Sequence, residues 1–267
     1  MTTALIFQGE SMVAYEGWLN RRKWNAPKAS LISLFCGLLG AGFFVPFACA
    51  AQEVMAGWEG NSFSGNGAVT AAFTIPLSQT SAIMIRPAAS YLYYDVRQIG
   101  LVTEVSAPAL SLGIGYRYSD TRVTFDISPA VQVLWERRKM IGGTTTERRR
   151  VGAGIASGLS FQATPLTSFN LVAGYDTSNK YFTSRAGIKR RITDLQLQKP
   201  WWVQIGAEII AQGNDETRQL SGGGLAEIAF DRGKSALQLR AGYSWFTYPD
   251  HSKLERPYLG AGLYHRF

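Results

Sequence analysis

The chain has 267 residues, of which 46% are hydrophobic and only 17% charged, and it contains 28 glycines and a mean hydropathy of -0.03. A soluble helical enzyme normally carries more charge and less glycine, so this class is disfavoured. The formal charge of +8 suits a partner rich in phosphate or anionic sugar. The basic residues form no single stripe with interleaved aromatics, so nucleic acid is not an expected partner.

Residues 1–50 are predicted to be a signal peptide with a long leader. Arg21 and Arg22 precede an apolar run at 31–47, and Ala48-Cys49-Ala50 forms a small-residue cleavage motif. Translation starting at Met12 and a membrane anchor are the alternatives, although the run is short for a spanning helix. Because both cysteines lie in this segment, the mature chain is expected to have no disulfide and no thiolate metal site.

From residue 53 onward, apolar and polar residues alternate, which is the pattern of strands with two different faces. In residues 201–212, for example, Ile205, Ala207 and Ile209 share one face and Gln204 and Glu208 share the other. Turn clusters divide the chain into about twelve strands, near 53–60, 67–75, 80–93, 99–117, 122–136, 147–162, 167–176, 180–192, 201–212, 217–230, 235–247 and 257–267.

Most of these strands are longer than the ~5–6 residues typical of soluble proteins. They reach the ~9–11 residues that a tilted membrane strand needs. We therefore predict an all-β fold over 51–267, an antiparallel transmembrane up-and-down β-barrel of about 12 strands, in the outer membrane of a Gram-negative bacterium. A secreted β-sandwich is the alternative, and 10 or 14 strands would also fit.

Connection lengths agree with a barrel whose two termini face the periplasm, where turns are short. Short connections are predicted at 119–121, 163–166 and 231–234, and longer outer loops at 137–146 and 249–256. Aromatic residues near strand ends are expected to form two interfacial girdles. They are Trp58, Tyr93, Tyr94, Tyr116, Tyr118, Trp135, Tyr175, Trp201, Trp202, Trp245 and Tyr248.

The chain ends in Phe267, and a terminal phenylalanine resembles the assembly signal that the barrel assembly machinery recognises. Such signals usually carry an aromatic or apolar residue two positions earlier, where this chain has His265. The barrel assembly machinery is therefore an expected partner.

Catalytic, metal and cofactor sites are not predicted. The mature chain has two histidines, His251 and His265, and no cysteine, which is too few for a typical metal site. A hydrolase needs a nucleophile within reach of a base, but His251 and the adjacent Ser252 would point to opposite faces of a strand. Gly222-Gly223-Gly224 lies inside a strand, where glycine marks a bulge or a close backbone approach.

Two sets of charged residues are candidate sites. One flanks a predicted outer loop and could contact lipopolysaccharide phosphates or another polyanion, or could simply pair across a hairpin with Glu136 and Glu147. It comprises Arg137, Arg138, Lys139, Arg148, Arg149 and Arg150. The other is predicted to face the lumen, either as a paired plug or as the lining of a solute channel. It comprises Arg86, Arg117, Asp126, Glu208, Glu227 and Arg240.

Residues 167–267 carry a series of short motifs, at 167–175, 181–182, 185–188, 205–208, 213–214, Arg218 and the glycine-rich strand 222–224, and Gly57-Trp58-Glu59 adds a looser one. These motifs resemble those of the BcsS family of outer-membrane proteins encoded with cellulose synthase. The resemblance implies a non-enzymatic accessory role in making or exporting cellulose or a related exopolysaccharide, with a polysaccharide synthase complex as a partner. It assigns no catalytic residues.

Two alternatives remain open at this point. One is a passive, porin-like channel for small solutes, and the other is a lipid A-modifying barrel enzyme. In all three cases the expected surroundings are outer-membrane lipids and lipopolysaccharide, and no cofactor is expected.

Overall fold

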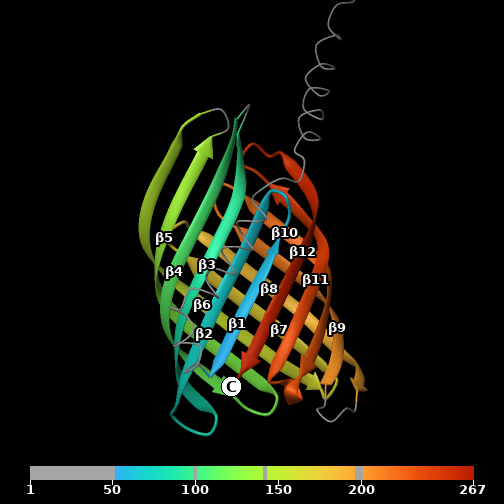
Figure 1. Cartoon of the computed structure of the whole chain (residues 1–267). Helices are drawn as coiled ribbons and strands as arrows, with labels where there is room; N and C mark the ends of the chain where they lie inside the picture. Colours follow the sequence, from blue (N-terminus) through green and yellow to red (C-terminus); the bar gives the residue numbers. More distant parts are fainter. Residues whose placement is uncertain (1–51, 99–100, 141–142, 196–200) are drawn as a thin grey trace, which may run out of the picture. The chain divides into compact units, whose positions relative to one another are not determined.

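In the computed structural model, residues 52–98, 101–140, 143–195 and 201–267 are described, and they form a closed antiparallel barrel (Figure 1). The predicted signal segment lies outside these residues. No helix within the described ranges is long and apolar enough to cross a bilayer. The strands are β1 (Glu53–Gly60), β2 (Ser64–Pro76), β3 (Ser81–Gln98), β4 (Leu101–Ser119), β5 (Val123–Met140), β6 (Thr145–Thr164), β7 (Thr167–Asp176), β8 (Tyr181–Leu195), β9 (Trp201–Gly213), β10 (Arg218–Phe230), β11 (Ser235–Thr247) and β12 (Lys253–Arg266).

The strands follow one another around the barrel in chain order, and β1 closes the circle by pairing with β12 from Glu53↔Arg266 to Gly60↔Leu259 (Figure 1). This confirms the predicted up-and-down barrel and its count of about twelve strands. Closure leaves no unpaired sheet edge, which is the condition for placing strands in lipid. We call the end at which β1 begins and β12 ends the terminal end, and the opposite end the distal mouth.

The prediction of long distal loops is wrong. Strand β5 continues to Met140 and β6 begins at Thr145, with pairing up to Lys139↔Thr145, so the basic residues near this hairpin belong to strands. Likewise β12 already begins at Lys253. The sequence failed to show this because polar residues continue the strands beyond the apolar segment, and apolar alternation was the signal used to delimit them.

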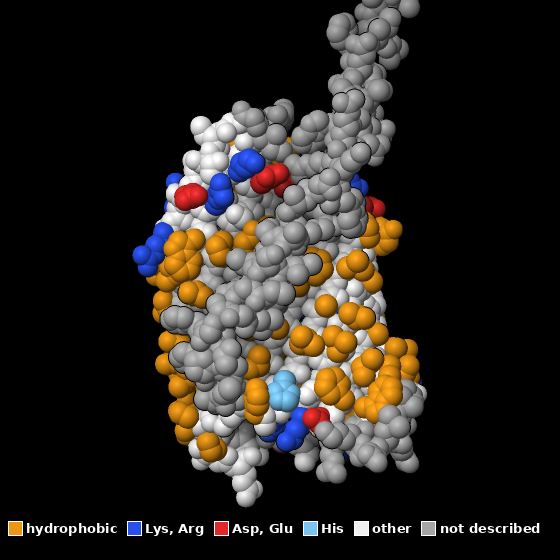
Figure 2. Space-filling model, in the orientation of Figure 1, with side chains coloured by type: hydrophobic (Ala, Val, Ile, Leu, Met, Phe, Trp, Pro, Cys, Tyr) orange, Lys and Arg blue, Asp and Glu red, His pale blue; other side chains and the backbone are white. Residues whose placement is uncertain are grey.

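The outward face of the barrel is apolar. On β4, Leu110, Leu112 and Ile114 are all more than half exposed, and on β9 Ile209 is 60% exposed while the neighbouring Glu208 is 4% exposed. Figure 2 shows hydrophobic side chains over the middle of one face, with charged side chains nearer its two ends. A surface of this kind is stable against lipid rather than water.

The aromatic girdles were predicted correctly only in part. Outward and exposed aromatics do lie near strand ends, among them Tyr116, Tyr118, Trp135, Tyr175 and Trp245. Three other residues of the predicted set do not belong to a girdle. Tyr94 is buried in the lumen, Tyr248 is buried and stacks on Phe246, and Trp202 lies under the Arg191 guanidinium at 4.2 Å.

Glycines of β10 and β11 make room for a lumen tyrosine. Gly223 pairs with Gly242, and a Cβ at Gly223 would lie 2.6 Å from the Tyr258 hydroxyl and 2.3 Å from the Ala241 carbonyl oxygen. The tyrosine ring therefore fits against a wall without side chains. This is the close approach expected for the glycine-rich segment 222–224.

We expect Gly223→Ala to destabilise the barrel by about 1–3 kcal/mol, the usual cost of overpacking. Gly224→Ala is the matched control, because its Cβ would meet only the Gly206 carbonyl oxygen at 3.7 Å. The measurement is the temperature at which the folded, faster-migrating gel band disappears. Equal temperatures for the two variants would contradict the proposed packing of Tyr258.

Candidate functional site: the lumen and the distal mouth

Near the terminal end, the inward-facing charges form separate ion pairs. Arg117 lies 2.9 Å from Glu53, Arg86 lies 2.8 Å from Asp126, and Lys189 lies 2.9 Å from Glu227. Their side chains keep between 12% and 18% of their surface exposed. This part of the lumen therefore still contacts water.

In the middle of the lumen, charges from opposite walls meet. Arg185 on β8 pairs with Glu59 on β1, although these two strands are not neighbours in the barrel. Glu208 on β9 accepts a hydrogen bond from the Tyr258 hydroxyl at 3.0 Å and lies 3.5 Å from Arg240. Because Glu59 and Arg185 come from strands that are not neighbours, this central cluster bridges the lumen.

Between this cluster and the distal mouth, the lumen is packed. Leu134, Ile210 and Phe246 point inward and are each 2% exposed, and Tyr94 is 4% exposed. A chain of side-chain hydrogen bonds runs beside them through Ser64, Gln212, Gln219, Ser221 and Ser244.

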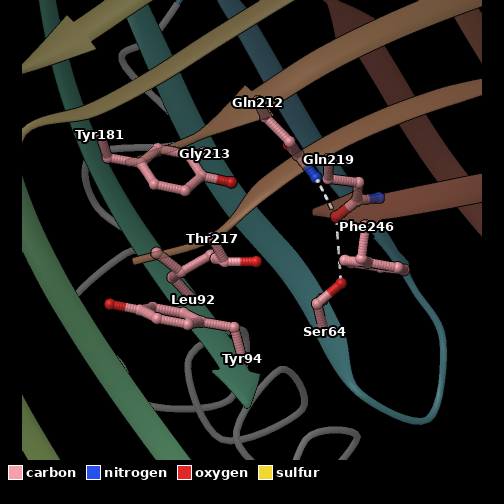
Figure 3. A pocket seen from close by; sticks show the side chains of 10 residues that line it. Ser64, Leu92, Tyr94, Tyr181, Gln212, Gly213, Thr217, Gln219 and Phe246 are labelled. Atoms are coloured by element: carbon pink, nitrogen blue, oxygen red, sulfur yellow. Dashed lines mark hydrogen bonds between the residues drawn. The ribbon is translucent and has the colours of Figure 1, made fainter. Parts of the chain in front are cut away.

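Figure 3 shows Tyr94, Tyr181, Gln212 and Phe246 around a small void in this layer. Its volume is about 10 Å³, which is space for about one water molecule. In a water-filled pore such inward side chains would be exposed, whereas here they pack against one another; we call this layer the plug.

At the distal mouth, a second charged cluster joins strands to turns. Arg138 on β5 donates hydrogen bonds to Glu136 at 2.7 Å and to Glu216 of the β9–β10 turn at 2.6 Å. Arg150 on β6 donates to Glu136 at 3.1 Å and to the backbone oxygen of Ser178 in the β7–β8 turn, also at 3.1 Å. These contacts surround a cavity of about 250 Å³.

The predicted patch of six cations is divided between two faces. The side chains of Arg138 and Arg150 point inward and belong to the charged cluster at the distal mouth. Arg148 shares their inward register. Arg137, Lys139 and Arg149 point outward, and among the described residues Arg137 forms an ion pair with Glu147 at 3.6 Å. The cause is the two-residue period of a strand, which sends consecutive residues to opposite faces.

All six of the candidate lumen charges lie on inward-facing positions and have partners there: Arg86, Arg117, Asp126, Glu208, Glu227 and Arg240. Four further lumen residues were not predicted, and they complete the central and terminal clusters: Glu53, Glu59, Arg185 and Lys189. The strand period would have placed Arg185 and Lys189 on one face. Their partners across the barrel could not be found from local pattern.

Two motif residues of the family resemblance, Asn214 and Arg218, lie at the distal end. Asn214 donates a hydrogen bond to the Tyr94 hydroxyl at 3.2 Å and accepts two from backbone N–H groups of its own turn. Arg218 is exposed at the start of β10. Asn214 thus fixes the turn that carries Glu216.

The distal β11–β12 loop is held by Asp250. Hydrogen bonds from the Ser252 hydroxyl (2.6 Å) and backbone N–H (2.9 Å) hold the pKa of the Asp250 carboxyl below its usual range. His251 lies in this loop with a left-handed backbone (φ 61°) and is exposed. In the part of the chain that the structure describes, no group of three His, Cys, Asp or Glu side chains could hold a metal ion.

His265 does meet a serine, which the sequence analysis did not expect. Ser235 Oγ lies 2.8 Å from His265 Nδ1, and the imidazole packs edge-on against Phe267. In a catalytic triad the serine contacts Nε2, and a carboxylate orients the ring through Nδ1. The nitrogen used here is the other one, so the geometry of this pair differs from that of a triad.

These observations define a closed membrane β-barrel with a packed, charged lumen. The sequence model of the family described as cellulose biosynthesis protein BcsS matches residues 47–267, so the chain belongs to this family. Membership links the protein to cellulose biosynthesis and confirms the resemblance found in the sequence. No curated protein sequence matches the chain.

Several solved barrels are similar to this chain in fold. The beta domain of the Bordetella autotransporter BrkA has a TM-score of 0.49 at 14% identity, covering 80% of this chain and 97% of that domain. LpxR from Salmonella typhimurium scores 0.47 at 8% identity, covering 80% and 100%. The translocator domain of the autotransporter NalP from Neisseria meningitidis scores 0.44 at 13% identity, covering 90% and 98%. Identities this low say nothing about activity.

We expect Glu208→Gln to destabilise the barrel by about 1–3 kcal/mol, because it takes one of two carboxylate partners from the partly buried Arg185 and Arg240. Glu255→Gln, on the exposed face of β12, is the control and should have no effect beyond about 0.5 kcal/mol. The measurement is equilibrium unfolding in urea. If Glu208→Gln unfolds at the wild-type midpoint, the central cluster is not stabilising.

Proposed function

We propose that this protein is a non-enzymatic outer-membrane barrel with an accessory role in the biosynthesis or secretion of cellulose or a related exopolysaccharide. Membership of the BcsS family supports the pathway. The observation that carries the non-enzymatic, non-channel role is the plug, in which inward side chains such as Leu134, Ile210 and Phe246 are each 2% exposed. A barrel filled in this way serves best as a rigid support that presents its two ends.

The two alternatives have less support. A passive channel needs a wetted path, whereas charges of β1, β8, β9 and β11 meet across the lumen. A lipid-modifying enzyme needs an oriented base next to its nucleophile. The Ser235–His265 pair uses Nδ1 for the serine contact, and within the described residues no carboxylate is hydrogen-bonded to His265.

The proposed location is the outer membrane of a Gram-negative bacterium. The exposed apolar outer face supports residence in a bilayer, and the proposed cleavage of residues 1–50 supports export. We orient the terminal end toward the periplasm, because the two termini of such barrels face that side, and a polysaccharide synthase complex would be reached there. Phe267 at this end remains the proposed signal for the barrel assembly machinery.

Deleting the gene should reduce the cellulose held at the cell surface, and the wild-type gene should restore it. The matched test compares complementation by Gly224→Ala, which leaves the lumen wall intact, with an empty vector. Cellulose is measured by dye binding and by cellulase-released glucose. Unchanged cellulose in the deletion strain would contradict the proposed function.

A second proposed contact is with lipopolysaccharide. On β5 the outward residues run from apolar positions through Trp135 to Arg137 and Lys139, and on β6 Arg149 lies opposite Trp135. Three cations with one anion, Glu147, therefore lie just beyond the aromatic edge of the apolar surface. This is the depth of the phosphate groups of lipid A, which guanidinium groups bind well.

We expect the triple variant Arg137→Gln, Lys139→Gln, Arg149→Gln to retain less lipopolysaccharide after purification in mild detergent. Arg122→Gln, in an exposed turn at the terminal end, is the control for loss of positive charge. Bound lipopolysaccharide is quantified by its phosphate and its 3-hydroxy fatty acids. Equal amounts on the triple variant and the wild type would rule out this contact.

A further inference from the structure

The distal cavity has walls from several separate parts of the chain. Glu136 and Arg138 come from β5 and Arg150 from β6, while the turns 177–180 and 214–216 supply the opposite walls. The two turns are linked by Lys180 and Asp215 at 3.3 Å. The cavity of about 250 Å³ is therefore held in shape by side chains that bond across it.

The floor of this cavity is closed. Tyr94 lines it, and its hydroxyl donates to Glu216 at 3.1 Å and accepts from Asn214 at 3.2 Å. On the other side of Tyr94 lies the small void of Figure 3, with space for about one water molecule. A ligand that enters from the distal side therefore stops at Tyr94.

The charges that line the cavity cancel. Its cations are Arg138, Arg150 and Lys180, and its anions are Glu136, Asp215 and Glu216. Each cation has a carboxylate partner within the cavity, so a charged ligand would gain little net attraction.

Hydrogen-bonding capacity nevertheless remains. The side chains of Arg138, Arg150 and Glu216 keep 28%, 29% and 31% of their surface exposed. Asn179 adds a side-chain amide, whereas the Thr177 and Ser178 hydroxyls already donate to the Ala153 backbone oxygen and to Asp176. The described lining residues thus offer donors and acceptors at zero net charge, and Tyr94 is the aromatic residue among them.

The geometry points to a binding site for a neutral saccharide, with space for about one or two sugar rings given that pockets for drug-sized ligands are typically ~300–1,000 Å³. Sugar hydroxyls can donate to Glu216 and accept from Arg138 and Arg150. An uronic acid polymer would bring charge that the lining cations can meet only by giving up a carboxylate partner; Arg148 faces inward beside Glu136 but does not line the cavity. This inference deepens the proposed function and rests on it for the identity of the sugar, a β-linked glucan.

The test uses the full-length mature barrel, purified in detergent, with cellohexaose as the probe and isothermal titration calorimetry as the readout. We expect the wild type to bind cellohexaose and not to bind a galacturonate oligomer of the same length. We expect Glu216→Gln to bind about tenfold more weakly, since a hydrogen bond to a charged group is worth roughly that factor.

A second cavity variant and a control on the outer surface complete the test. The double variant Lys180→Gln, Asp215→Asn removes an exposed ion pair from the rim of the cavity without changing the net charge. It should therefore weaken cellohexaose binding while the folded, faster-migrating gel band persists. Glu255→Gln, on the outer surface, should bind like the wild type. Absence of cellohexaose binding, tighter binding of the galacturonate, or unchanged affinity in both cavity variants would each overturn the site.

Failure of this site is distinguishable from failure of the proposed function. If a strain with Glu216→Gln makes normal cellulose although its purified barrel has lost cellohexaose binding, the site stands and the accessory role does not depend on it. If the deletion strain lacks cellulose but the wild-type barrel binds no cellohexaose, the function stands and the saccharide site is wrong.

Discussion

A charged side chain that points into a closed barrel has to find its partner inside, because the wall separates it from bulk water and lipid offers no hydrogen bonds. Much of this structure follows from that constraint. Glu208 is 4% exposed and meets Arg185, Arg240 and the Tyr258 hydroxyl. Tyr258 reaches it only because Gly223 and Gly242 leave space against the wall. The glycine wall of β10 and β11, the Tyr258 ring and the ion pairs of Glu208 therefore pack together as one unit.

The same constraint acts differently along the barrel axis. Toward the terminal end the ion pairs are simple and partly hydrated, as in Arg86–Asp126. Toward the distal mouth, apolar and hydroxyl side chains exclude water. Charged side chains are found again at the mouth itself, where the β9–β10 and β7–β8 turns contact Arg138 and Arg150. The outcome is a barrel with a plugged interior and a structured distal cavity, which suits a protein that works at its ends.

Alternation in the sequence was enough to predict the strands, their approximate number and the inward direction of the candidate lumen charges. It was not enough for the distal hairpin, where the polar residues of β5 and β6 continue the pairing to Lys139↔Thr145. Nor could it group Glu59 with Arg185, because their strands are far apart in the chain and meet only across the lumen. The cationic run 137–139 was treated as one patch, although the strand period that predicted the fold also separates Arg138 from its neighbours.

The account depends most on the lumen being closed by side chains. Single-channel recording of the purified mature barrel in a planar bilayer tests this directly, with the protein confirmed as folded by its heat-shifted gel band. Closed packing around Tyr94, Ile210 and Phe246 predicts insertion without a steady ohmic current. A stable open-channel current that persists in the folded protein would contradict the plug and support the passive channel instead.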